Sequence, residues 1–171
     1  MLPKKLEAAL NEQVNAELYS AYLYLSMSSW FESKNLKGFA NWMRIQYQEE
    51  TAHAMKFFDY INERGGTAVL KAIDAPKGKW KTVIEIFQET LKHELHVTSL
   101  INNLVNISIS EKDHATNNFL QWFVSEQVEE EANVTGILEE LKMIEGKGPA
   151  LFMIDRELKQ RVFVPITPTG A

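Results

Sequence analysis

Apolar residues recur at three- and four-residue intervals along most of the chain, which is the spacing of one face of an α-helix. The first such stripe contains Leu6, Leu10 and Val14. The periodicity predicts four long helices and a short fifth one, over residues 6–33, 38–64, 81–109, 113–143 and 150–161. Signals for β-strands are nearly absent, so the sequence predicts an all-α protein.

The lengths of the connections predict how these helices are arranged. Residues 35–37 and 110–112 are short connections, so the helices that each one joins should be antiparallel neighbours. Residues 66–80 can run the length of a bundle, which would let the second and third helices lie parallel. We therefore expect a four-helix bundle with one long crossover in residues 1–145. A hinge, the short fifth helix and an extended or mobile tail should follow in residues 146–171.

Each of the four long helices has its apolar stripe interrupted near mid-length by a residue that can bind a metal. The interruptions are Glu17, then Glu50 and His53, then Glu94, then Gln127 and Glu130. Counted from the two short turns, at about 1.5 Å of rise per residue, their heights along the bundle differ by only a few ångströms. The sequence therefore predicts one polar layer that crosses all four helices.

A layer of buried carboxylates requires a positive charge. An unpaired buried carboxylate costs several kcal/mol, and four together repel one another. Glu50 and His53 form a Glu-x-x-His pair, whose spacing places both side chains on one helix face, as in carboxylate-bridged di-iron bundles. Oxygen ligands with a single imidazole favour iron or manganese over a soft metal.

Each of these residues alone has a plainer explanation. A single Glu in a helical stripe is usually at the edge of the buried face, and a lone His53 is more often a hydrogen-bonded core residue. The acidic run at 126–131 alone is typical of a solvated face. Four interruptions at one height favour the metal site. His93 and His96 resemble a zinc-protease motif, but that motif requires its second histidine at i+4. Both flank the apolar stripe of the third helix and do not lie in it, so we expect them to be partly exposed.

Composition and charge exclude several classes of function. The net charge of -5 argues against a nucleic-acid partner, because affinity for a duplex comes from neutralising phosphates. The chain has no cysteine, which excludes disulfides, thiolate zinc sites and a cysteine nucleophile. No apolar run is long enough for a bilayer and the first residues lack a secretory signal, so we expect a cytoplasmic protein with no membrane partner.

The motifs resemble those of the non-haem ferritins of bacteria and archaea. The matching stretches are LNEQVNAELYSAYLY (10–24), FANWMRIQYQEETAHAMKFFDYI (39–61), FQETLKHE (87–94), FLQWFVSEQVEEEA (119–132) and LFMIDREL (151–158). The resemblance implies a ferritin-like four-helix bundle with a short fifth helix, assembled from twenty-four subunits into a hollow shell. It also implies iron storage, with Fe(II) oxidised by O2 or peroxide at an intrasubunit di-iron centre and Fe(III) kept as a hydrated oxide mineral.

Carried over position by position, the resemblance implies three iron sites. The first has Glu17, Glu50 and His53, and the second has Glu50, Glu94 and Glu130 with Gln127 nearby. The third has Glu49, Glu126, Glu129 and again Glu130. Tyr24 corresponds to the tyrosine that donates an electron during oxygen reduction.

Departures from the related bacterioferritins affect the expected cofactors. Those proteins carry a methionine beside the second-helix motif to hold haem, and a second Glu-x-x-His on the fourth helix. Here the corresponding positions are Ala52, Gln127 and Glu130, so no haem is expected. A second site without a histidine fits a centre through which iron passes.

Two other functions remain open at this point. One is a ferritin-like di-iron oxygenase or peroxidase, which predicts a smaller assembly and a substrate pocket. The other is a helical scaffold without a metal. Near the third-to-fourth-helix turn, Glu111, Asp113 and His114 suit an iron entry channel and helix-cap or surface roles equally well, and Asp113 is a plausible N-cap.

Overall fold

The computed structural model describes residues 1–166, which form five helices and no strand. The all-α prediction is therefore confirmed. The helices are α1 (Lys4–Ser33), α2 (Lys37–Glu63), α3 (Val83–Ser110), α4 (His114–Met143) and α5 (Pro149–Leu158). Residues 167–171 of the predicted tail lie outside the described residues. Within residues 1–166, no helix combines the length and the apolar composition that a membrane span requires.

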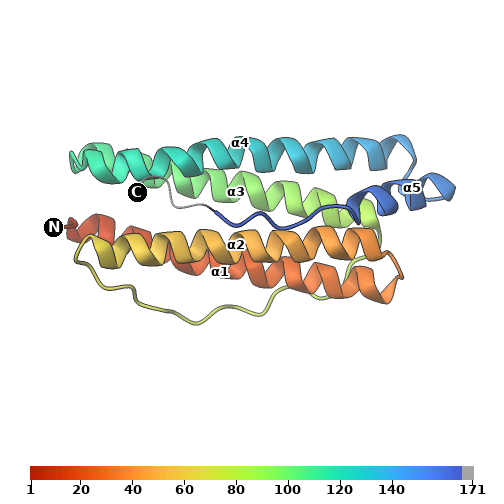
Figure 1. Cartoon of the computed structure of the whole chain (residues 1–171), viewed down its shortest axis with the longest axis horizontal. Coiled ribbons are helices and arrows are strands. Elements are labelled where there is room, and N and C mark those ends of the chain that lie inside the picture. Colours follow the sequence, from red (N-terminus) through yellow and green to blue (C-terminus); the bar gives the residue numbers. More distant parts are fainter. Residues whose placement is uncertain (167–171) are drawn as a thin grey trace.

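The bundle has the predicted topology with one long crossover (Figure 1). α1 packs against α2 and α3 against α4, in antiparallel pairs joined by short turns. The connection from α2 to α3 runs the length of the bundle, so that α2 and α3 are parallel. Side chains of α1 hold this connection: Asn11 Oδ1 accepts from the backbone N–H of Val69 at 2.6 Å, and Ser26 Oγ donates to the carbonyl of Lys77 at 2.8 Å.

Side chains cap the beginnings of α3 and α4. The Thr82 hydroxyl accepts from the backbone N–H of Glu85 at 3.0 Å, and Asp113 accepts from that of Thr116 at 2.9 Å. Each bond satisfies a backbone donor that has no partner inside the helix. Asp113 also forms a 2.8 Å ion pair with Arg64, which joins the end of α2 to the start of α4. Of the two roles open to Asp113, the structure shows the helix cap.

The apolar core lies in two clusters, one toward each end of the bundle. Phe39 and Phe87 belong to one cluster, and Phe57 and Phe123 stack in the other with ring centroids 4.0 Å apart. Burying an aromatic side chain of this size contributes roughly 1.5–3 kcal/mol. The predicted polar layer lies between the clusters, so apolar packing on both sides holds its height along the bundle.

The fifth helix ends three residues earlier than predicted, at Leu158 instead of residue 161. Contacts with α2 override the helical periodicity here. The side-chain amide of Asn41 donates to the carbonyl of Arg161 at 3.0 Å and to that of Leu158 at 3.3 Å. The Arg161 side chain meanwhile reaches Glu49 on α2. Residues 161–166 then leave the helix and run back along the bundle (Figure 1).

A close contact with the start of α2 positions α5. Asp155 Oδ1 accepts from the backbone N–H groups of Gly38, at 2.8 Å, and Phe39, at 3.0 Å. These groups lie in the first turn of α2, where they have no partner inside the helix. A Cβ at Gly38 would lie 1.5 Å from the carbonyl oxygen of Asp155, so this approach requires a glycine.

Replacing Gly38 with alanine is therefore expected to lower the free energy of unfolding by at least about 2 kcal/mol, through overpacking and loss of the cap that Asp155 provides to α2. Gly136 on α4 is a matched control, because a Cβ there meets nothing within 4 Å. Gly136→Ala should stabilise the helix by about 0.5–1 kcal/mol. Thermal unfolding of both variants, with limited proteolysis of the α5 region, measures the difference. Equal effects at the two positions would contradict the packing argument.

Candidate metal centre

The six residues that interrupt the apolar stripes are all buried in the middle of the bundle. None of them is more than 5% exposed. They are Glu17 on α1, Glu50 and His53 on α2, Glu94 on α3, and Gln127 and Glu130 on α4. The structure therefore has the polar layer that the periodicity predicts.

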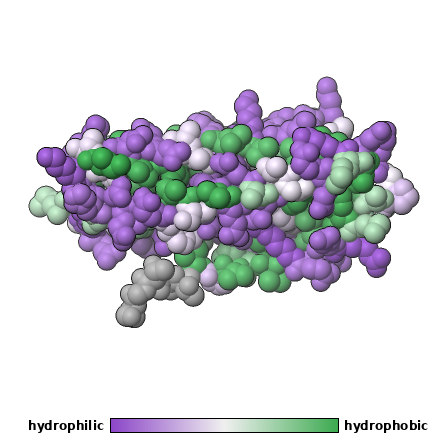
Figure 2. Space-filling view, turned by 90° about the horizontal axis from the view of Figure 1, so that it is seen from above, coloured by the Kyte–Doolittle hydropathy of each residue, from purple (hydrophilic) through white to green (hydrophobic). Residues whose placement is uncertain are grey.

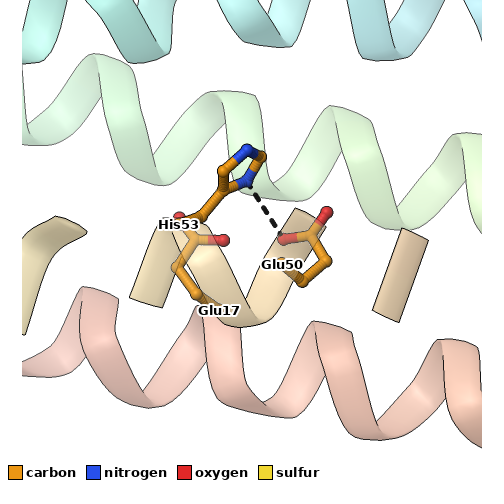
Figure 3. Close-up of side chains that lie close together, drawn as sticks. All are labelled: Glu17, Glu50 and His53. Atoms are coloured by element: carbon orange, nitrogen blue, oxygen red, sulfur yellow. Dashed lines mark ion pairs between the residues drawn. The ribbon is translucent and has the colours of Figure 1, made fainter. Parts of the chain in front are cut away.

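Three of the six gather most closely. Glu17, Glu50 and His53 each offer one potential ligand atom, and these atoms lie within 4.8 Å of one another. Figure 3 shows Glu17 rising from α1 toward the two side chains of α2. His53 Nδ1 is 3.5 Å from Glu50 Oε2. Two carboxylates and an imidazole at this spacing form a donor set that suits a divalent cation such as Fe(II).

Glu17 has one oxygen without a partner. Its Oε1 accepts from the amide of Gln13 at 2.8 Å, whereas its buried Oε2 makes no hydrogen bond. Burial, with the neighbouring charge of Glu50, raises the pKa of Glu17 to about 8. A buried acceptor beside Glu50 and His53 is the arrangement that a metal ion would satisfy.

Glu94 and Glu130 are held by neutral hydrogen-bond donors. Glu94 accepts from the hydroxyl of Tyr24 and, at 3.3 Å, from the amide of Gln127. Glu130 accepts from the amide of Gln46 at 2.9 Å. Burial, with the charge of Glu94, raises the pKa of Glu130 to about 7, and burial also raises the pKa of Glu94. Among the described residues, neither carboxylate joins the closely gathered group of Glu17, Glu50 and His53.

Tyr24 is fully buried and belongs to this layer through its hydroxyl. Burial, with the charge of Glu94, raises the pKa of Tyr24 well above its ordinary value, so the phenol keeps its proton. Its ring is nearly perpendicular to that of His93, at 86°, with the centroids 6.0 Å apart. His93 is half-buried and His96 is exposed, in agreement with the expectation that both are partly exposed. Burial, with the neighbouring His96, lowers the pKa of His93 to about 4.

Within the described residues, the third predicted set does not form a group as close as that of Glu17, Glu50 and His53. Glu49 and Glu126 are partly exposed and Glu129 is exposed. Glu49 Oε2 forms a 2.6 Å ion pair with Arg161, while Glu126 lies 3.9 Å from His53 Nε2. Burial still raises the pKa of Glu49 to about 7, although the Arg161 charge acts in the opposite direction.

Three residues at the site were not predicted from the sequence: Gln13, Gln46 and Arg161. The two glutamines lie four residues before Glu17 and Glu50, so an i, i+4 pattern was available to find them. Arg161 donates to Gln46 Oε1 at 2.5 Å and to Glu49 from the far end of the chain, a contact that no local pattern indicates.

A groove of about 830 Å³ lies between α2 and α4, on the outer side of Trp122, whose ring contacts that of His53. Its walls include Tyr60, Phe119 and Trp122, but none of the buried carboxylates. This groove is therefore not the substrate pocket that an oxygenase or peroxidase would need at its metal centre.

Residues 7–144 match the ferritin family model, which is described as a ferritin-like domain. This range contains all four long helices apart from the first three residues of α1. The chain belongs to the ferritin family. The family membership that the sequence motifs predict is therefore confirmed. Membership in this family supports a role in iron storage.

Relatives of this ferritin-family chain cover nearly its whole length. A bacterial non-heme ferritin of Bacteroides fragilis is 47% identical over 161 residues, which is 94% of this chain and all of the relative. One from Campylobacter jejuni is 41% identical over 93% of this chain and 95% of its own length. The crystal structure of an open pore ferritin from Archaeoglobus fulgidus has a TM-score of 0.93 and 51% identity, over 95% of this chain and all of that one. The predicted bundle with a short fifth helix is therefore confirmed as a ferritin fold.

Proposed function

We propose that this chain is an iron-storage ferritin subunit. It oxidises Fe(II) to Fe(III) with O2 or peroxide inside the bundle, and a hollow shell of twenty-four subunits holds the product as a hydrated oxide mineral. The observation that carries the proposal is the buried layer of acidic side chains, in which Glu17 Oε2 has no partner beside Glu50 and His53.

The charges of the layer support a metal substrate. Glu17, Glu50, Glu94 and Glu130 are almost fully buried, and burial raises the pKa of each carboxyl group. Metal ligands must be deprotonated, so binding of Fe(II) to these groups displaces protons. In the metal-free protein, bound protons reduce the repulsion between these carboxyl groups. Neutral hydrogen-bond donors such as the hydroxyl of Tyr24 stabilise them further.

The roles follow the geometry of the layer. In the proposal, the first Fe(II) binds Glu17, Glu50 and His53, and the second binds Glu50, Glu94 and Glu130, with Gln127 orienting Glu94. Glu50 is the shared ligand. When bound, the two Fe(II) ions supply the electrons that reduce the oxidant.

The remaining predicted residues act around this pair. Tyr24 holds Glu94 through its hydroxyl and lies close enough to donate an electron to the centre. Glu49, Glu126 and Glu129 provide a third position together with Glu130, reached by an ion that approaches the partly exposed face of α2 and α4.

The surface of the single subunit supports self-association. Phe152 and Met153 on α5 are 60% and 73% exposed, and Val69 and Leu70 on the long connection are also exposed. Figure 2 shows hydrophobic side chains gathered in patches on an otherwise hydrophilic face. Patches of this kind are commonly buried between subunits of an assembly.

Size-exclusion chromatography with light scattering, before and after aerobic addition of Fe(II), tests the proposal. We expect a particle near twenty-four times 19.6 kDa that takes up far more iron than the three sites of each chain hold. A small oligomer that stops once the two ions of each centre are bound would favour a di-iron oxygenase or peroxidase instead. Failure to bind iron would favour a structural scaffold.

A further inference from the structure

The chain returns along the bundle after α5. Residues 159–166, here named the return segment, run back between α2 and α4 (Figure 1). Phe163, Pro165 and Ile166 line the groove together with Phe119 and Trp122 of α4. The return segment therefore covers the side of the bundle on which Glu49 and Glu126 are partly exposed.

Arg161 anchors the return segment to α2. Its Nη2 donates to Glu49 Oε2 at 2.6 Å and its Nη1 to Gln46 Oε1 at 2.5 Å. Its guanidinium carbon lies 4.8 Å from the centre of the Trp42 ring, a cation–π contact. The backbone carbonyl of Arg161 accepts from Asn41. Four side chains on one face of α2 thus fix this arginine.

The Arg161 charge acts on the acidic residues proposed for the third iron position. It is the main charge that opposes the effect of burial on the pKa of Glu49, and it adds to the larger effect of His53 on the pKa of Glu126 and Glu130. The charge of Lys56 also lowers the pKa of Glu126, and the Lys56 amine itself lies over the ring of Trp122. In the metal-free protein, the guanidinium is therefore a positive charge at a place where the proposed function puts a metal ion.

Gln46 connects Arg161 with the buried layer. Because Arg161 donates to Gln46 Oε1, the amide is fixed with its Nε2 toward Glu130, to which it donates at 2.9 Å. Glu130 is the residue that the proposed second and third iron positions share. Removing Arg161 would free the amide to rotate and would free the Glu130 oxygen that it holds.

We propose that Arg161 is a displaceable counter-cation of the third iron position. The guanidinium neutralises Glu49 while the position is empty, and a divalent cation that takes Glu49 as a ligand displaces it. Two positive charges on one carboxylate repel each other, so occupancy of the position and docking of the return segment exclude one another. This inference rests on the proposed function and adds a regulation to it, in which arriving iron loosens the segment that covers the site.

Binding of an ion at the third position and docking of the return segment affect each other to the same extent, so the coupling can be measured through either event. In the metal-free protein in its native assembly, we would titrate Zn(II) by calorimetry at constant pH. Arg161→Gln is expected to tighten binding of the third ion of each chain by about tenfold, a typical coupling factor. The first ion should bind as in the wild type, because Gln46 connects Arg161 with Glu130 and not with Glu17, Glu50 or His53. Arg156→Gln is the matched control, because Arg156 is exposed on α5 and makes no ion pair within the described residues.

Hydrogen exchange of the wild-type protein provides the second readout and does not depend on the variant folding. Saturation with Zn(II) should increase amide exchange in residues 159–166, and Glu49→Gln should abolish this increase. Unchanged affinity for the third ion in Arg161→Gln overturns the inference, as does unchanged exchange of the return segment. Failure of the proposed function gives a different result, because the first two ions would then not bind to the wild type.

Discussion

Replacing Glu50 with glutamine is expected to lower the initial rate of Fe(II) oxidation by about 100-fold or more. Loss of a residue that only orients a ligand typically costs 10–100-fold, and Glu50 is proposed to bind both ions directly. It lies beside Glu17 and His53 in the most closely gathered group of the layer. His53→Ala should have a similar effect, because it removes the single imidazole. Stopped-flow absorbance after mixing metal-free protein with Fe(II) in air measures the rate.

The same variant separates loss of a ligand from loss of the fold. Burial, with the charges of Glu94 and Glu130, raises the pKa of Glu50 and so favours its neutral form, which an amide of the same shape replaces without adding a charge. The melting temperature of metal-free Glu50→Gln should therefore equal or exceed that of the wild type. Glu139→Gln is the control, because Glu139 lies in an exposed ion pair with Lys142 on α4. A wild-type oxidation rate in Glu50→Gln would refute the assignment.

The helices and the buried layer could be predicted from the sequence because both depend on a local period. A helical stripe constrains residues three and four positions apart, so the bounds of the four long helices agree with the structure within two residues. The interruptions at Glu17 and Glu94 were visible for the same reason. Two short turns then defined the common height of the layer, since the rise per residue of a helix is constant.

The parts that could not be predicted depend on contacts between distant segments. Asp155 caps the start of α2 from a position 117 residues away, and Arg161 reaches Glu49 across 112 residues. No periodicity encodes either contact. The early end of α5 is a consequence, because the chain leaves the helix where Asn41 and Glu49 bind it. The resemblance to ferritins supplied Glu49 as a candidate ligand, but only the structure shows its arginine partner.

The metal-free protein is expected to lose stability as the pH rises from about 5 to about 8. The pKa is raised to about 8 for Glu17 and to about 7 for Glu130, whereas an unfolded glutamate titrates near 4.5. Between these values the folded state binds more protons than the unfolded state, so the free energy of unfolding falls with increasing pH. One proton of difference changes it by about 1.4 kcal/mol per pH unit, so the loss over this range is on the order of 4 kcal/mol from Glu17 and 3 kcal/mol from Glu130.

A bound divalent cation should reverse this trend, because it requires the ionised form of the same carboxylates. At a thousandfold excess over the dissociation constant, a ligand that binds only the folded state adds about 4 kcal/mol per site. Melting temperatures with EDTA and with Zn(II), across this pH range at one protein concentration, measure both slopes. Glu17→Gln should flatten the metal-free slope, because it removes the group with the highest of these pKa values. A metal-free melting temperature that rises with pH would show that the layer is not held by protons, and the need for a cation in the bundle would then lose its physical basis.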